Sequence, residues 1–163
     1  MLKALADAGV TEGKIGIVSV NASTNSTVSR ETGFKAAFEG KDGFELLETV
    51  YAEGKAVESQ EAATNFISQD VVGIFGANEG SAVGVGNAIK ESGKDIIGVG
   101  FDNSDSIKGL ITEGKLLCTM VQNPDVMGRD GLKAAVNAIQ GNPIVGEAVI
   151  DTGVTVVNAS NVG

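Results

Sequence analysis

The sequence contains no histidine, no tryptophan, one cysteine, two prolines and one tyrosine among its 163 residues. The absence of histidine excludes Ser-His-Asp and Cys-His catalysis and removes a ligand that most catalytic zinc sites use. Because Cys118 stands alone, neither an intrachain disulfide nor a CxxC motif can form. We therefore expect a non-enzymatic protein with no catalytic residue, no metal and no cofactor.

Basic residues are also scarce, with 12 Lys and Arg against 21 Asp and Glu and a formal charge of −9. Nucleic-acid binders concentrate Lys and Arg to neutralise phosphates, and this chain has no basic run, so we expect no nucleic-acid partner. No apolar run approaches the ~18 residues of a membrane span. Residues 1–10 lack the apolar centre and the cleavage site of a signal peptide.

Glycine, in contrast, is abundant, with 23 residues, about twice the usual share. Hydrophobic residues make up 42% of the chain and charged residues 20%, which is typical of a globular domain. A chain of this length buries a sizeable core without disulfides or metals. The composition predicts a single domain over residues 1–163, rich in tight turns.

Short apolar runs alternate with amphipathic stretches along the chain. The runs predict strands at residues 15–20, 44–51, 71–76, 96–100, 116–121 and 153–158. The stretches between them predict helices at residues 26–38, 55–68, 81–91, 104–112 and 125–140. This repeated β-α pattern predicts an α/β fold of three α/β/α layers around a doubly wound, mainly parallel sheet of the Rossmann or flavodoxin-like class.

Several residues have predicted structural roles. In helix 26–38, one side is expected to carry Val28, Phe34, Ala37 and Phe38. Residues 109–116 (GLITEGKL) lack the hydroxyl residue of a P-loop and close a helix, which favours Gly114 as a helix C-cap. The pair Gly84 and Gly86 lacks the third glycine of GxGxxG. These two glycines are expected to allow close packing of helix 81–91 on the sheet.

Ligands of doubly wound sheets bind beyond the carboxyl ends of the strands. Four polar residues fall there: Arg30, Asn78, Asp102 and Gln122. Arginine offers a fixed fork of donors, aspartate offers acceptors, and the two amides offer both, which suits a hydroxyl-rich ligand. A structural role is the alternative for each. Arg30 can pair with a surface carboxylate, Asn78 and Asp102 can cap the helices that follow them, and Gln122 can be a turn residue.

Four motifs carry a family resemblance. They are Arg30-Glu31-Thr32-Gly33-Phe34, Ile74-Phe75-Gly76-Ala77-Asn78-Glu79, Val99-Gly100-Phe101-Asp102, and the segment from Gly114-Lys115-Leu116 through Gln122-Asn123-Pro124 to Met127-Gly128. In order and spacing, they resemble the sugar-binding proteins of bacterial ABC transporters, of the ribose-binding-like, type I periplasmic binding protein kind. The resemblance runs from about Lys14 to the end of the chain.

The resemblance is to the second, C-terminal lobe of these two-lobed proteins. It implies that Arg30, Asn78, Asp102 and Gln122 hydrogen-bond sugar hydroxyls and that Phe101 shapes the pocket. It also implies that residues 1–8 form the helix after a hinge crossing and that helix 125–140 packs on the missing lobe. For the full-length protein it implies a monosaccharide ligand, a membrane permease as partner, and a periplasmic or membrane-anchored extracellular location.

One departure and three alternatives stay open. The family usually places an aromatic after the second strand to stack on the sugar, and here Tyr51 is the nearby aromatic, so the kind of sugar stays open. An effector-binding lobe of a lac-repressor-type regulator shares the fold, although residues 116–119 (LLCT) replace its usual Pro-x-Leu-Thr segment. A self-associating half-protein, dimeric through helix 125–140, is the second alternative. An enzyme using Asp102 and Glu79 is the third.

Overall fold

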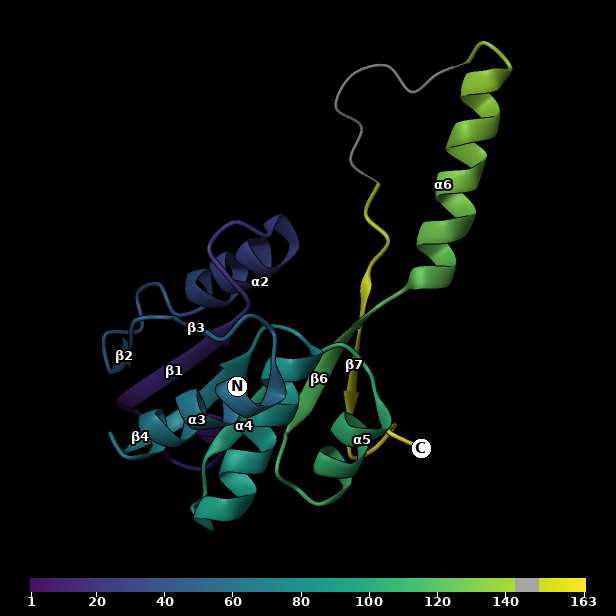
Figure 1. The fold of residues 1–163 in the computed structure, drawn as a ribbon. Helices are drawn as coiled ribbons and strands as arrows, with labels where there is room; N and C mark the ends of the chain where they lie inside the picture. The colour runs from purple at the N-terminus through teal and green to yellow at the C-terminus, as the bar shows by residue number, and fades with distance from the viewer. Residues whose placement is uncertain (143–149) are drawn as a thin grey trace.

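The structure is a computed structural model, and it describes residues 1–142 and 150–163 (Figure 1). In chain order the elements are α1 (Leu2–Asp7), β1 (Gly13–Ser19), α2 (Asn25–Ala36), β2 (Phe44–Leu46), β3 (Val50–Tyr51), α3 (Ala56–Ile67), β4 (Val71–Gly76), α4 (Glu79–Ser92), β5 (Ile97–Phe101), α5 (Asp105–Thr112), β6 (Cys118–Gln122), α6 (Pro124–Ile139) and β7 (Val154–Asn158). The predicted helices, and every predicted strand except the second, are confirmed with ends within two residues of those expected.

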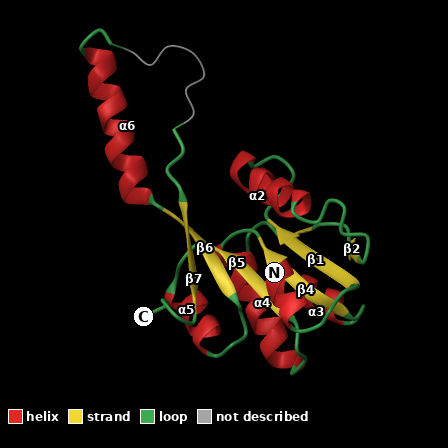
Figure 2. Cartoon of the chain, turned by 180° about the vertical axis from the view of Figure 1, so that it is seen from behind, coloured by secondary structure: helices red, strands yellow, loops and turns green. Residues whose placement is uncertain are grey.

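The strands form one sheet in the order β2-β1-β4-β5-β6-β7, with β3 also paired to β1 (Figure 2). The pairings along this path are parallel up to β6, and β7 runs antiparallel to β6. Helices α1 and α2 cover one face, where Phe34 of α2 stacks on Phe75 at 4.5 Å between ring centroids. Helices α3, α4 and α5 cover the other face. The predicted three-layer, doubly wound fold is confirmed.

The predicted strand at residues 44–51 is wrong as a single element, because it divides into β2 and β3. Both pair in parallel with β1, but Ile15 lies opposite Leu46 whereas Val18 lies opposite Val50. The edge segment therefore holds one more residue than β1 over the same span, which breaks the ladder as a bulge does. A run of apolar letters cannot reveal this extra residue.

The side that α2 buries coincides only in part with its predicted apolar side. Ala37 is exposed, while Thr27 and Glu31 are buried together with Phe38. The buried stripe therefore follows helical spacing but includes two polar side chains. Glu31 is tolerated there because Lys35 and Thr49 donate hydrogen bonds to its Oε1 atom, each at 2.6 Å.

The glycines of α4 face neighbouring helices, so their predicted packing on the sheet is wrong. A Cβ atom added at Gly84 would lie 2.6 Å from the carbonyl oxygen of Ala56 in α3, and one at Gly86 would lie 2.5 Å from the side chain of Leu110 in α5. The two glycines therefore allow helix–helix contact. The C-cap residue of α5 is Glu113 and not Gly114 as predicted. Gly114 comes directly after it, and its φ of 70° is the left-handed conformation in which helices commonly end.

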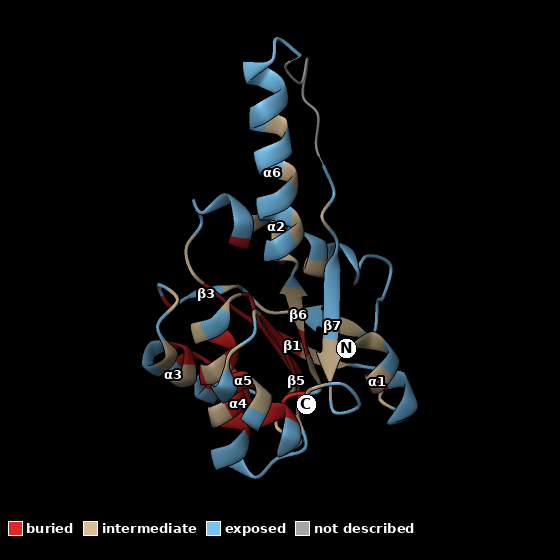
Figure 3. Cartoon of the chain, turned by 90° about the vertical axis from the view of Figure 1, so that its right-hand side faces the viewer, coloured by how far each residue is buried: buried red, intermediate tan, exposed pale blue. Residues whose placement is uncertain are grey.

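Helix α6 projects away from the three layers (Figure 1). Among the described residues none of α6 is buried, and Figure 3 shows most of the helix in the colour of exposed residues. Leu132, Val136 and Ile139 are 67%, 42% and 86% exposed. Their spacing places them on one side of the helix, which makes an apolar stripe without a partner in the described part of the chain.

Candidate functional site

Arg30 joins the carboxyl ends of three strands. It lies on α2, and its Nη1 atom donates to the carbonyl of Ala77, which follows β4, at 2.9 Å. Its Nη2 atom donates to Oε1 of Gln122, the last residue of β6, at 3.2 Å and lies 3.6 Å from Oδ1 of Asp102, which follows β5. Three of the four predicted polar residues, from distant parts of the chain, therefore meet at one edge of the sheet.

The Phe101 ring packs against the guanidinium group of Arg30. The guanidinium carbon of Arg30 lies 3.7 Å from the centroid of the Phe101 ring, which is a cation–π contact. The Arg30 side chain is only 12% exposed. Burial lowers the pKa of Arg30 from its ordinary value, while the Asp102 carboxylate acts in the opposite direction. The guanidinium stays charged, and the ring and its neighbours fix its orientation.

Asp102 connects β5 to two other elements. Its amide donates to the carbonyl of Met120 in β6 at 2.8 Å, and its Oδ2 atom accepts from the amide of Glu79, the first residue of α4, at 3.0 Å. The alternative role of Asp102 as the cap of the following helix is wrong. Ser104 caps α5, because its side chain accepts from the amide of Ile107. Asp102 is one-third exposed, so part of its carboxylate is open to a ligand.

Asn78 has the capping role that its sequence position predicts. Its Oδ1 atom accepts from the amide of Ser81 at 3.1 Å and closes the first turn of α4. Its Nδ2 atom faces Gly54, where an added Cβ would lie 2.9 Å away. Asn78 therefore flanks the Arg30 cluster through its chain neighbours Ala77 and Glu79, and no hydrogen bond joins its side chain to Arg30.

The two amide side chains have a fixed polarity. Arg30 donates to the oxygen of Gln122, and Ser81 donates to the oxygen of Asn78, so both amide groups keep their NH₂ donors for other partners. Asp102 supplies the charged acceptor. A ligand that offers oxygen acceptors to the amides and a hydroxyl donor to the carboxylate matches this arrangement, as a polyol does.

Sequence reasoning missed two contributors to this edge. The carbonyl of Ala77 holds Arg30, and the hydroxyl of Thr119 donates to the Asp102 carbonyl at 2.7 Å. A threonine inside an apolar strand was the available signal for the second. Tyr51 lies in β3 opposite Ser19 of β1, is 44% exposed, and makes no hydrogen bond to the Arg30 cluster in the described part of the chain. Gly54 occupies the loop that follows β3.

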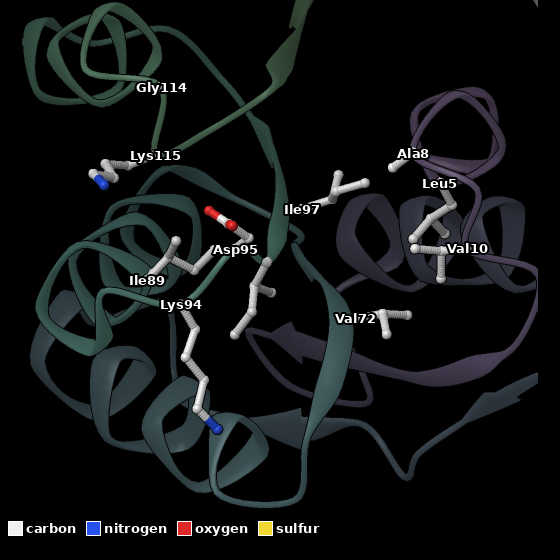
Figure 4. Close-up of a pocket in the computed structure, with 11 residues that line it drawn as sticks. Leu5, Ala8, Val10, Val72, Ile89, Lys94, Asp95, Ile97, Gly114 and Lys115 are labelled. Atoms are coloured by element: carbon white, nitrogen blue, oxygen red, sulfur yellow. The ribbon is translucent and has the colours of Figure 1, made fainter.

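A cavity of about 340 Å³ lies at the other end of the strands. Figure 4 shows Leu5, Val10 and Val72 on one side of it, with Ile97 between them and Lys94 on the far side. The ammonium group of Lys94 donates to the Ile67 carbonyl and to Asp70. The lining of this cavity is mostly apolar and includes none of the five predicted binding residues, so the cavity is not the candidate site.

The described residues contain neither a helix that could span a membrane nor a cluster of metal-binding side chains. No helix in this part of the chain is both long enough and apolar enough to cross a membrane. No group of three or more Cys, Asp or Glu side chains in the same residues could hold a metal ion.

The fold is a doubly wound sheet, and the polar cluster around Arg30 lies at the carboxyl ends of its strands, where ligands of such sheets bind. The profile of the periplasmic binding protein domain matches residues 1–143. The chain belongs to this family. The predicted resemblance to ribose-binding-like proteins is confirmed.

Curated relatives are named for sugar binding. The chain is 26% identical over 141 residues to the D-allose-binding periplasmic protein of Escherichia coli (strain K12), covering 84% of this chain and 45% of that protein. It is 27% identical over 132 residues to a ribose import binding protein of Haemophilus influenzae, covering 80% and 45%. The chain therefore spans about half the length of the curated relatives it matches.

Solved structures share the fold over almost the whole chain. A solute-binding protein of an ABC transporter from Agrobacterium vitis, bound with alpha-D-tagatopyranose, is 29% identical with a TM-score of 0.88, and the match covers 98% of this chain and 54% of that one. A carbohydrate transporter solute-binding protein from Agrobacterium radiobacter, in complex with D-arabinose, is 31% identical with a TM-score of 0.86, covering 98% and 55%.

Proposed function

We propose that this chain supplies one lobe of the ligand cleft of a sugar-binding protein for carbohydrate uptake by an ABC transporter. The convergence of Arg30, Asp102 and Gln122 over Phe101, at the edge of the sheet where ligands of such folds bind, carries the proposal. The names of the relatives support a sugar as the ligand. The bound sugars of two structural neighbours support a monosaccharide.

Each predicted residue has a role in this proposal. Arg30 and the amides of Asn78 and Gln122 donate to sugar oxygens, Asp102 accepts from a hydroxyl, and Phe101 forms the wall beneath. Because an unpaired buried polar group costs about 1–3 kcal/mol, a sugar that leaves one of these groups without a partner binds less tightly. The protein binds its ligand without transforming it.

The rest of the cleft comes from a second lobe. The match to about half of each relative supports a two-lobed protein that closes on its ligand around a hinge. In that protein the apolar stripe of α6 packs on the other lobe. A membrane permease receives the sugar, and the whole protein works in the periplasm or as an anchored protein outside the membrane.

Titration of the ¹⁵N-labelled chain with a panel of pentoses and hexoses tests the site. We expect weak binding, with shifts confined to the Arg30, Asn78 and Gln122 side chains and the Asp102 amide. Asp102→Asn is expected to remove these shifts, whereas Asp42→Asn, which changes an exposed carboxylate before β2, is expected to keep them. Micromolar affinity in the isolated chain would contradict the proposal that it holds only half of the site. If none of the sugars produced shifts, the proposed function would be contradicted.

The other hypotheses make different predictions. An effector lobe of a transcription regulator would act through an attached DNA-binding segment, and it stays a hypothesis. An enzyme working through Asp102 and Glu79 predicts turnover that Asp102→Asn abolishes. In the structure the Asp102 carboxylate accepts from the backbone amide of Glu79, which favours a positioning role for Asp102.

A further inference from the structure

The backbone of Asp102 has an unusual conformation. Its φ of 75° lies in the left-handed region, which residues with a side chain adopt rarely. Aspartate tolerates this region better than most residues, but the surroundings still have to hold it there. The contacts of the Asp102 backbone therefore determine where its carboxylate points.

Two hydrogen bonds from β6 hold this backbone. The Asp102 amide donates to the Met120 carbonyl at 2.8 Å, and the Thr119 hydroxyl donates to the Asp102 carbonyl at 2.7 Å. The first is an ordinary bond between neighbouring strands. The second fixes the carbonyl at the point where the chain leaves the sheet, and it depends on one side chain.

Thr119 is fully buried, beside Gly100 in the parallel pairing of β5 with β6. A buried hydroxyl lowers stability unless it has a hydrogen-bond partner, and the Asp102 carbonyl is that partner. Valine has nearly the same shape as threonine and would suit the apolar surroundings of the strand. The hydroxyl is therefore explained by its contact with Asp102 and by no requirement of packing.

The Asp102 carboxylate contacts two other elements, α4 and α2. With its backbone held, Oδ2 accepts from the Glu79 amide at 3.0 Å and Oδ1 lies 3.6 Å from Nη2 of Arg30. A backbone shift that displaces the Asp102 Cα and Cβ atoms would move both carboxylate oxygens together. One buried hydroxyl on β6 thus orients a carboxylate that touches the start of α4 and the arginine of α2.

We propose that Thr119 is a positioning residue of the sugar site, acting through the backbone of Asp102. This inference rests on the proposed function for its ligand, but the geometry that it invokes exists without one. Removing the hydroxyl frees the Asp102 peptide, weakens the bond to the Glu79 amide and lowers sugar affinity.

The test compares Thr119→Val, which removes the hydroxyl at nearly constant shape, with Thr119→Ser, which restores it. Thr112→Val is the matched control, because the Thr112 hydroxyl also donates to a carbonyl, that of Lys108 within α5, far from the site. Amide hydrogen exchange at Glu79 is the readout without ligand, and sugar-induced shifts of the Gln122 side-chain amide are the readout with D-ribose.

We expect exchange at Glu79 to accelerate about tenfold in Thr119→Val, relative to other amides of α4, and to return in Thr119→Ser. Sugar-induced shifts should shrink in the valine variant and remain in Thr112→Val. In an Asp102→Ala background, Thr119→Val should have no further effect on the titration, since the two residues act in one chain of contacts.

Several results would overturn the proposal. One is a folded Thr119→Val protein with unchanged exchange at Glu79, and another is faster exchange spread evenly over the whole sheet. If the valine variant does not fold, Thr119→Ala replaces it, and loss of the fold in both variants would make the hydroxyl purely structural. Absence of sugar shifts in the unaltered chain would contradict the proposed function alone, because the Glu79 readout needs no ligand.

Discussion

At the scale of single residues, the site owes its polarity to bonds within the protein. Arg30 occupies the oxygen of Gln122, and the first turn of α4 occupies the oxygen of Asn78. A free amide could present either its oxygen or its nitrogen to a ligand. Here the oxygen of each amide already accepts one bond from the protein while both N–H donors remain, so the neighbours of each side chain bias it toward donating to a ligand.

Gln122→Glu separates the two roles of this side chain, which accepts from Arg30 and has an amide donor for a ligand. The variant keeps an acceptor for Arg30 but replaces the donor by a second acceptor, so we expect an unfolding free energy within about 1 kcal/mol of the original and loss of sugar-induced shifts. Thermal unfolding and the sugar titration measure the two effects. Asn78→Asp makes the same exchange while keeping the cap of α4. A Gln122→Glu protein that still binds sugar would show that the amide donor makes no contact.

Glu31 shows a second use of a buried charge, away from the site. Its side chain is only 9% exposed, and its Oε1 atom accepts from Lys35 and from Thr49, at the bulge between β2 and β3. Burial acts to raise the pKa of Glu31, but the hydrogen bonds from Lys35 and Thr49 and the charge of Lys35 outweigh burial and lower it. The charged form therefore ties the edge strands to α2.

The lowered pKa of Glu31 predicts a pH dependence of stability. A carboxyl group whose pKa falls on folding stabilises the folded chain above its unfolded pKa, and that contribution is lost as pH falls through the folded pKa. Glu31→Gln should therefore destabilise the protein at neutral pH and reduce the loss of stability on acidification. Urea unfolding between neutral and acidic pH measures both. Parallel curves for the two proteins would contradict this role.

At the scale of elements, glycines set the distance between α3 and α4. A Cβ atom at Gly80 would overlap the carbonyl oxygen of Gly54, and one at Gly84 would lie 2.6 Å from backbone atoms of α3. The two glycines are four residues apart, so they lie on one side of α4. Backbone therefore packs against backbone along this side, next to Asn78 and Glu79 at the start of α4.

Gly84→Ala is expected to destabilise the protein by about 1–3 kcal/mol, because the added methyl group must push α3 away. Gly109→Ala is the matched control in α5, where an added Cβ would meet nothing within 4 Å in the described part of the chain. Alanine there should stabilise the protein by about 0.5–1 kcal/mol through its better helix propensity. Urea unfolding compares the two. Equal effects would show that the α3–α4 distance adjusts freely.

The sequence predicted what depends on local pattern and left out what depends on register. Apolar runs and helix caps located α4 and β4 within two residues. The rule that ligands bind beyond the carboxyl ends of strands selected Arg30, Asn78, Asp102 and Gln122, and in the structure all of these except Asn78 meet directly. The division of β2 from β3 depends on one extra residue opposite β1, and the backbone role of Thr119 depends on which strand lies beside β5. Both are consequences of pairing between distant segments, which a single sequence does not contain.

At the scale of the whole molecule, α6 is the element that the described chain does not explain. Its apolar stripe of Leu132, Val136 and Ile139 lies in solvent, while α1 to α5 each bury residues in the layers. Exposed apolar surfaces of this kind mark interaction sites. In the proposed two-lobed protein the other lobe covers the stripe, and in the isolated chain a second copy is the available partner.

The isolated chain should therefore self-associate through α6. We expect light scattering to give a mass that rises with concentration, and the double variant Leu132→Ser/Ile139→Ser to remain monomeric with the stability of its sheet unchanged, because neither side chain contributes to the core. Asn137→Ser, which changes an exposed polar position of the same helix, is the control and should associate like the original chain. A strictly monomeric chain whose α6 amides are protected from exchange would contradict association and would place the stripe against the chain's own sheet. Joining the other lobe should remove association without any substitution, because the same stripe cannot pack on a lobe and on a second copy at once.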